Sequence, residues 1–280
     1  MEIHSVKTHK NLASVFAVLA AVIFFLIILT PYFWMLLVSF KSTPEIMQYP
    51  GRIWPIHWVM SGYVTVITAA PFFNWFFNSV IVTGSTTLLV LFTSSIAGFV
   101  FAKYTFRWKN TLFWFILASM MVPFQTIMIP NFLMVDMVGL YDKLLALIIP
   151  VMISGFGIFL CRQFCEDIPD SLCEAAKIDG AGDFYIYARV IIPLLRPCLA
   201  ALAIFSFLDN WNEYLRPLIM LESVKSMTLP VALSFFTSGT HTHDMSACMA
   251  AAAMIMMPVT IVFLCFQKNF IKGITISGIK

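Results

Sequence analysis

Long apolar runs separated by short polar segments form the dominant pattern along this chain. A helix needs about 20 predominantly apolar residues to cross the hydrocarbon core of a bilayer. Six segments meet that requirement: 13–38, 74–101, 111–134, 143–161, 198–220 and 246–266. Backbone polar groups find no partner in lipid, so such segments are expected to be helices, whereas a β-barrel would show short alternating runs. The pattern predicts an all-α integral membrane protein with six transmembrane helices, in a single domain over residues 1–280.

Composition supports the same class. Of the 280 residues, 60% are hydrophobic and 11% are charged, and the mean hydropathy is +0.90. Soluble domains contain about 25% charged residues, so this chain could not cover a water-soluble surface, and membrane lipid is expected around it. The uncharged run 12–40 is longer than the apolar core of a signal peptide, and no small-residue cleavage site follows it. We therefore expect a retained first span.

The basic residues predict the orientation in the cell membrane. With a cytoplasmic N-terminus, 12 of the 17 Lys and Arg residues lie in segments that face the cytoplasm, in line with the excess of basic residues in cytoplasmic loops. Six spans then return the C-terminus to the cytoplasm and place the segment 162–197 there. The formal net charge of +3 does not indicate a nucleic-acid partner.

Charge is concentrated in the cytoplasmic loop 162–197, which holds 10 of the 31 charged residues. Ser171 and Glu174 fit a capping box at the start of a short helix over 172–179. Gly180 suits the left-handed residue that ends such a helix.

A second short helix is predicted over 184–192, capped by Asp183 and ended by Pro193. Ala175 and Ala176 leave the backbone of the first helix accessible, and the second helix adds aromatic bulk. An exposed apolar patch on a cytosolic loop usually marks an interaction site. The alternative is an amphipathic hairpin that lies on the lipid headgroups.

The residue order of this loop resembles the EAA loop of ATP-binding-cassette (ABC) importer permeases. The shared order is Glu174-Ala175-Ala176, three residues, Gly180, nine residues, Val190, one residue and Ile192-Pro193. Val190 and Ile192 stand where the family usually has Ile and Leu. The stretches SFKSTPEI, LAIFSFLDNWNEYLRPLIML and FQKNFIKGITISGIK are similar to carbohydrate-uptake permeases, specifically to the second permease of the maltose transporter. The resemblance covers essentially the whole chain.

This resemblance implies the type I ABC importer permease fold, with coupling helices in the cytoplasmic loop that dock onto an ATPase. The residues assigned to docking are Glu174, Ala175, Ala176, Asp179, Gly180, Phe184 and Pro193. Implied partners are a second homologous permease, a pair of ATPase subunits that bind ATP and Mg, an extracellular solute-binding protein and a di- or oligosaccharide substrate. The chain has no Gly-rich phosphate loop, so we expect it to be no enzyme and to bind no cofactor itself.

Polar residues in the fifth predicted span mark a second candidate site. Asn210, Trp211, Asn212 and Glu213 could line a sugar path, because amides and carboxylates bond hydroxyls and an aromatic ring covers the apolar face of a sugar. Two other interpretations stay open. Glu213 could form a buried ion pair with Arg216, or these residues could form polar contacts between two permeases.

Two other functional classes fit parts of the pattern. An ion-coupled secondary transporter could use Asp209 and Glu213, but it needs no cytosolic docking loop. A membrane-embedded enzyme would need paired carboxylates with His, or a nucleophile with a base, and the spans offer neither. No metal site is expected, because the pair Cys161 and Cys165 and the run 241–244 lack further ligands at suitable spacing. The cysteines are expected to be free thiols that face lipid or cytosol.

Overall fold

The computed structural model describes residues 2–238 and 244–277, and every regular element in these ranges is a helix. The chain divides into two compact units, Met1–Ala70 with Leu233–Met256 and Pro71–Ala232 with Met257–Lys280. Each unit has its own packing, and the single-domain organisation stays a prediction.

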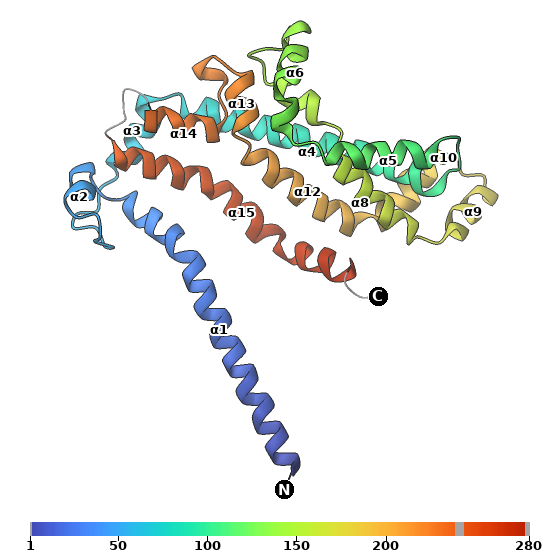
Figure 1. Cartoon of the computed structure of the whole chain (residues 1–280), viewed down its shortest axis with the longest axis horizontal. Helices are drawn as coiled ribbons and strands as arrows, with labels where there is room; N and C mark the ends of the chain where they lie inside the picture. Colours follow the sequence, from blue (N-terminus) through green and yellow to red (C-terminus); the bar gives the residue numbers. More distant parts are fainter. Residues whose placement is uncertain (1, 239–243, 278–280) are drawn as a thin grey trace. The chain divides into compact units, whose positions relative to one another are not determined.

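The first unit combines the N-terminal helices with segments from near the C-terminus (Figure 1). Its helices are α1 (Glu2–Val38), α2 (Thr43–Gln48), α3 (Ser61–Ala69), the second part of α14 (Leu229–Ser238) and the first part of α15 (Met245–Ser277). Asp244 accepts hydrogen bonds from the Thr43 hydroxyl at 2.8 Å and from the Ala247 N–H at 2.9 Å, which caps α15 and ties it to α2. A methyl group added to Gly62 of α3 would lie 2.5 Å from Ser246, so α3 and α15 cross closely.

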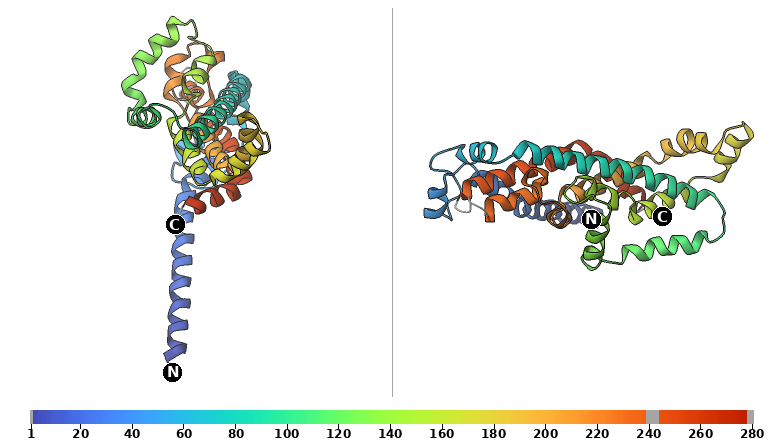
Figure 2. Two further views of the ribbon diagram at one scale, coloured as in Figure 1. Left: turned by 90° about the vertical axis from the view of Figure 1, so that its right-hand side faces the viewer. Right: turned by 90° about the horizontal axis from the view of Figure 1, so that it is seen from above.

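The second unit is organised around the long helix α4 (Phe72–Lys103), along which α8 (Gly155–Glu166) and α12 (Arg196–Trp211) pack (Figure 1 and Figure 2). Its other elements are α5 (Lys109–Met120), α6 (Phe124–Met137), α7 (Leu145–Ile148), η1 (Ile149–Val151), α9 (Asp170–Ile178), α10 (Asp183–Tyr185), the π-helix η2 (Ile186–Ile191), α11 (Ile192–Leu194), α13 (Leu215–Met220) and η3 (Val224–Ser226). The buried face of α4 is rich in small hydroxyl residues: Ser79, Thr83, Thr86, Thr87, Ser94 and Ser95. Small residues allow helices in lipid to approach closely and to pack by van der Waals contact.

Two glycines set the spacing between α4 and α8. A methyl group at Gly98 of α4 would lie 2.5 Å from Cβ of Cys161 and 2.8 Å from the backbone N of Arg162. A methyl group at Gly157 of α8 would lie 2.3 Å from Oγ of Ser94. Each helix therefore places a glycine where the other helix passes, and neither position has room for a larger side chain.

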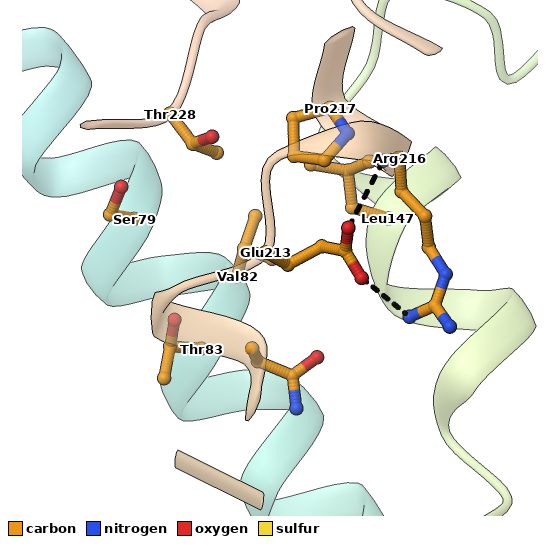
Figure 3. Close-up of a pocket in the computed structure, with 9 residues that line it drawn as sticks. Ser79, Val82, Thr83, Leu147, Glu213, Arg216, Pro217 and Thr228 are labelled. Carbon is orange, nitrogen blue, oxygen red and sulfur yellow. Dashed lines mark hydrogen bonds and ion pairs between the residues drawn. The ribbon is translucent and has the colours of Figure 1, made fainter. Parts of the chain in front are cut away.

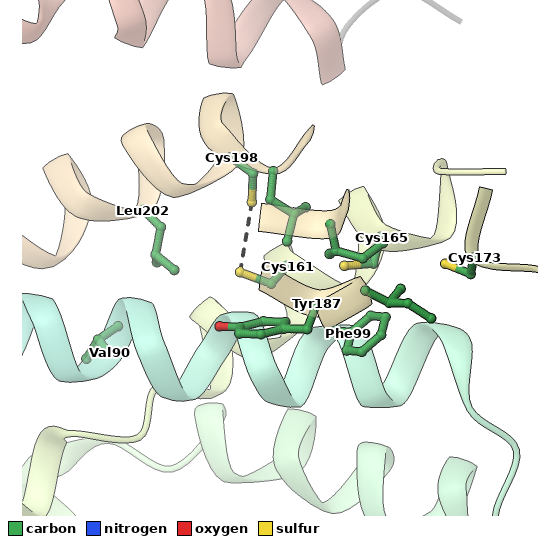
Figure 4. Close-up of a cluster of buried hydrophobic side chains, with 11 residues drawn as sticks. Val90, Phe99, Cys161, Cys165, Cys173, Tyr187, Cys198 and Leu202 are labelled. Atoms are coloured by element: carbon green, nitrogen blue, oxygen red, sulfur yellow. Dashed lines mark hydrogen bonds between the residues drawn. The ribbon is translucent and has the colours of Figure 1, made fainter. Parts of the chain in front are cut away.

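Four cysteines lie in the core of the second unit (Figure 4). Cys161, Cys165, Cys173 and Cys198 are buried among apolar and aromatic side chains. The thiol of Cys198 donates to the sulfur of Cys161 at 4.0 Å. The cysteines are free, as predicted, but the expectation that they face lipid or cytosol is wrong for these four. They act as small apolar residues that fill the core.

The six predicted spans are matched only when bent helix pairs are counted as spans. Among the residues that the structure describes, four helices are long and apolar enough to cross a membrane: Phe16–Val38, Phe72–Lys103, Asp183–Trp211 and Met245–Cys265. The pair α5 and α6 bends by 102°, and the pair formed by Leu145–Val151 and α8 bends by 42°. Both breaks occur close to prolines, Pro123 before α6 and Pro150 before α8. Proline removes a backbone donor and so disrupts a helix at such points.

The fifth span lies earlier in the chain than predicted. The continuous helical segment runs over Asp183–Trp211 instead of 198–220, so the predicted end of a helix at Pro193 is wrong. The π-helix η2 ends at Ile191, two residues before Pro193. A π-bulge shifts the hydrogen-bond register, and this allows the helix to continue past a residue that cannot donate.

The crossing of α4 and α8 leads to a stability prediction. We expect Gly98→Ala to destabilise the second unit by about 1–3 kcal/mol, because the added methyl group forces the helix backbones apart. The measurement is the thermal unfolding midpoint of the purified protein in detergent. Gly84→Ala is the matched control on the same helix, since nothing lies within 4 Å of a methyl group there. Equal midpoints for both variants would contradict the close crossing.

Candidate functional site

The predicted docking helix exists, but it begins differently. Helix α9 spans Asp170–Ile178, and Pro169 occupies the N-cap position without a side-chain hydrogen bond. The predicted capping box of Ser171 and Glu174 is therefore wrong. The reason is that Pro169 already supplies the extended backbone from which the helix starts, with Leu172 N–H bonded to its carbonyl at 3.2 Å.

The end of α9 has the predicted geometry. Gly180 has a φ of +83°, a left-handed conformation that glycine adopts without steric cost. Its N–H bonds to the carbonyl of Lys177 at 3.0 Å, and the N–H of Ala181 bonds to the carbonyl of Ala176 at 2.9 Å. This pair of bonds is a Schellman motif, which fixes the direction in which the chain leaves α9.

The second helix of the loop also starts without the predicted cap. Asp183 is the first residue of α10 and makes no side-chain cap bond, and Gly182 takes the N-cap position. The Asp183 carboxylate instead forms a hydrogen bond with the hydroxyl of Tyr104, which follows α4 directly. Burial, followed by this bond, raises the pKa of Tyr104 to about 12.

Lys103, the last residue of α4, attaches the start of α9. Its side chain is 7% exposed, and its ammonium group donates to the carbonyl of Ile168 and to Oδ1 of Asp170, the latter at 2.6 Å. The lysine lowers the pKa of Asp170 below its usual range. Lys177 adds a cation–π contact, 5.4 Å from the ring centre of Tyr104. Lys103 and Tyr104, at the end of α4, therefore contact the loop at three places: Asp170 at the start of α9, Lys177 near its end, and Asp183 at the start of α10.

The outer surface of the loop combines apolar and charged residues. Ile178 is 86% exposed and Phe184 is 77% exposed. The predicted docking residues Glu174, Ala175, Asp179, Gly180 and Pro193 are also exposed, and Ala176 is half-buried. Sequence reasoning did not select Ile178, although its place between a lysine and an aspartate at a helix end could have suggested exposure.

The second candidate site lies where helix α12 ends. The helix stops at Trp211, so Asn212 and Glu213 lie in a break before α13 and not inside a span. Glu213 Oε1 accepts the backbone N–H groups of Leu215 at 3.0 Å and Arg216 at 3.2 Å, and Oε2 lies 3.6 Å from the Arg216 guanidinium (Figure 3). The ion pair considered in the sequence analysis is therefore present, and Glu213 also caps the start of α13.

Arg216 connects this break to the break between α5 and α6. Its guanidinium carbon lies 4.5 Å from the ring centre of Phe124, the first residue of α6. A guanidinium above an aromatic ring is attracted electrostatically. Glu213 and Phe124 therefore contact Arg216 from two sides. Among the described residues of this site, Arg216 is the only basic one.

An open cleft of about 1070 Å³ lies beside the α12–α13 break. Asn210, Asn212 and Glu213 line it, as does Asp209. Trp211 differs from the prediction: its side chain is 1% exposed and packs against Phe76 and Phe207, with ring centres 6.4 and 5.5 Å away. Its ring does not line the cleft.

A small pocket of about 10 Å³ separates the same break from α4 (Figure 3). Buried hydroxyls of Thr83 and Thr228 line it, and neither has a hydrogen-bond partner in the described chain. Its volume and polar walls suit a single water molecule.

Metal ligands do not gather in the part of the chain that the structure describes: no group of three or more His, Cys, Asp and Glu occurs there. His241 and His243 lie outside the described residues.

Comparison with known proteins assigns the chain to a family. Residues 94–276 match the family described as binding-protein-dependent transport system inner membrane component. The chain belongs to this family. Both candidate sites of the permease, the α9–α10 loop and the α12–α13 break, lie inside the matched region.

Two relatives and one solved structure show the extent of the similarity. The arabinooligosaccharides transport system permease protein AraQ of Bacillus subtilis (strain 168) is 35% identical over 258 residues, which cover 91% of the permease and 92% of AraQ. The sn-glycerol-3-phosphate transport system permease protein UgpE of Shigella flexneri serotype 5b (strain 8401) is 30% identical over 210 residues, 75% of each chain. A crystal structure of a bacterial ABC transporter involved in the import of the acidic polysaccharide alginate matches with a TM-score of 0.81 at 26% identity, covering 94% of the permease and 98% of that chain.

These matches confirm the predicted fold class. The permease is an all-α, multi-pass membrane protein with the type I ABC importer permease fold. The EAA resemblance, read from the order of residues 174–193, led to the correct family before any geometry was known.

The attachment of the loop to α4 generates a test. We expect Lys103→Met to speed backbone hydrogen exchange in α9 by roughly fivefold, because the Ile168 carbonyl and Asp170 lose their donor. Asp170→Asn is the comparison variant. It removes only the exposed half of the contact, and exposed ion pairs contribute little, so exchange should change less than in Lys103→Met. Exchange in α9 that is insensitive to Lys103→Met would contradict this attachment.

Proposed function

We propose that the permease is a sugar-translocating membrane subunit of an ATP-driven importer, and that its α9–α10 loop docks onto a separate ATPase. One observation carries the proposal: Ile178 and Phe184 are strongly exposed on a loop that Lys103 and Tyr104 hold firmly against α4. A fixed loop that presents apolar side chains to water costs free energy unless a partner covers them.

Sugar is the proposed substrate class on two grounds. Relatives of the permease are named for arabinooligosaccharides, diacetylchitobiose and lactose. The cleft beside α12 offers amides, carboxylates and aromatic rings together, which suits the alternating polar and apolar surfaces of a sugar.

The proposed assembly contains four kinds of subunit. A second homologous permease completes the translocation path, an extracellular solute-binding protein delivers the sugar, and a pair of ATPase subunits binds ATP and Mg. The permease itself catalyses no reaction. ATP binding closes the ATPase pair and opens the path outward, and hydrolysis returns the path to its inward-open state.

The length of α4 supports a two-sided arrangement. Trp75, near its start, donates to the carbonyl of Val224 at 2.6 Å, and Lys103, at its end, holds Asp170. The 32 residues of α4 extend over roughly 48 Å, which exceeds the hydrocarbon core of about 30 Å. We place the α9–α10 loop and both termini in the cytoplasm and the segment that contains Val224 outside.

Docking is tested by copurification from gently solubilised native membranes. We expect the tagged permease to bring down an ATPase, a second permease and a solute-binding protein, identified by mass spectrometry. Glu174→Lys should reduce the copurified ATPase at least tenfold, since it reverses a charge beside the exposed apolar residues. Glu222→Lys is the matched control, because Glu222 is exposed in the segment between α13 and η3. Undiminished ATPase in Glu174→Lys would remove the docking role.

Orientation is tested by labelling with a membrane-impermeant maleimide. In a background of Cys248→Ala and Cys265→Ala, the remaining four cysteines are buried. We expect Glu222→Cys to be labelled in intact spheroplasts and Ile178→Cys only after permeabilisation, because the two positions lie at opposite ends of α4. Labelling of both from the outside would contradict the proposed topology.

A further inference from the structure

Aromatic side chains and one carboxylate share a wall of the cleft beside α12. Phe205 and Asp209 are four residues apart on α12, so they lie on the same helix face, and both are exposed in the cleft. Phe156 of α8 meets Phe205 edge to face, with ring centres 5.9 Å apart. Tyr214, in the break after α12, adds a third exposed ring. These three rings line the cleft, which the sequence analysis had expected of Trp211.

The charges on the cleft are unbalanced. Asp209 and Glu213 contribute carboxylates, and Arg216 is the single basic residue among the described residues of the wall. Arg216 is already engaged, because its guanidinium pairs with Glu213 at 3.6 Å and stacks on Phe124. Asp209 is therefore the one charged group of this wall that has no opposite charge beside it.

We infer that this wall of the cleft is a subsite for uncharged sugars, in which Phe156 and Phe205 cover the apolar face of a sugar ring and Asp209 accepts hydrogen bonds from its hydroxyls. This inference rests on the proposed function. A carboxylate accepts bonds from hydroxyls, but it repels a uronate or a phosphate. The wall offers no unpaired guanidinium or ammonium group to offset that repulsion.

Family membership leaves the charge of the substrate open. AraQ is named for arabinooligosaccharides, which are neutral, whereas UgpE is named for sn-glycerol-3-phosphate and the matched crystal structure for acidic alginate. The distinction must therefore come from the residues of the individual cleft. Asp209, Glu213 and the engaged Arg216 place this permease with the neutral class.

The test measures sugar binding to the purified permease complex without its solute-binding protein, so that the specificity of that protein does not contribute. Saturation-transfer NMR is recorded with neutral di- and trisaccharides of arabinose, glucose and galactose, and with matched oligosaccharides that carry a uronic acid. We expect binding of at least one neutral sugar and at least fivefold weaker binding of its acidic counterpart. Phe205→Ala should weaken neutral binding roughly fivefold, while Phe77→Ala, an exposed ring outside the cleft, should have no effect.

The charge contribution is tested separately. Asp209→Asn keeps the shape of the side chain and should narrow the difference between the neutral and acidic sugars at least fivefold. Asp136→Asn, which removes an exposed carboxylate outside the cleft, is the control and should leave the difference unchanged. Equal binding of both sugar classes to the unmodified complex, or an unchanged difference in Asp209→Asn, would overturn the inference while leaving the transport of sugars intact. A complex that binds and transports no sugar of either class would overturn the proposed function itself.

Discussion

The close packing of α4 against α8 and α12 is the contact on which the rest of the second unit depends. In lipid, helices gain little from hiding apolar surface, and they associate through shape and close approach. Gly98 and Gly157 supply this approach, each lying where a methyl group would meet the facing helix. Once α4 and α8 are in place, Trp75 near the N-terminal end of α4 binds Val224, and Lys103 at its C-terminal end binds the α9–α10 loop. Both candidate sites are therefore positioned by one helix.

Some of the buried polar groups beside this packing have a local partner. Ser95 and Tyr187 share a hydrogen bond of 2.7 Å inside the cysteine-containing core, and Ser79 accepts the N–H of Leu229 at 2.8 Å. Burying an unpaired hydroxyl is costly, yet several hydroxyls of this unit have no hydrogen-bond partner in the described chain: those of Thr83, Thr86, Thr87, Ser94 and Thr228. Thr83 and Thr228 border the small pocket at the α12–α13 break. The unpaired hydroxyls therefore follow the buried face of α4 and are not confined to the break.

Sequence patterns predicted the class of the protein and the end of helix α9 correctly, but they did not predict the bends in the helices. Apolar runs show that a segment is buried in lipid, but a run broken at Pro123 has the same composition as a straight one. Gly180 was predicted correctly because a left-handed residue is a local requirement. The predicted cap at Asp183 failed because Tyr104, which is distant in the sequence, binds its carboxylate. The capping box of Ser171 and Glu174 failed because α9 already starts from Pro169. The expectation that the ring of Trp211 lines the cleft also depended on a residue distant in the sequence, because Phe76 on α4 packs against this ring.

The π-helix ahead of Pro193 has a mechanical consequence. Without it, Pro193 would end the helix, and the α9–α10 loop and the span would be joined by a hinge. With it, the helical segment Asp183–Trp211 continues over 29 residues, with one turn residue, Leu195, between α11 and α12. One end carries Phe184 and the other adjoins Glu213. The exposed ring of Phe184 and the Glu213–Arg216 pair are therefore connected by helix and not by a flexible linker.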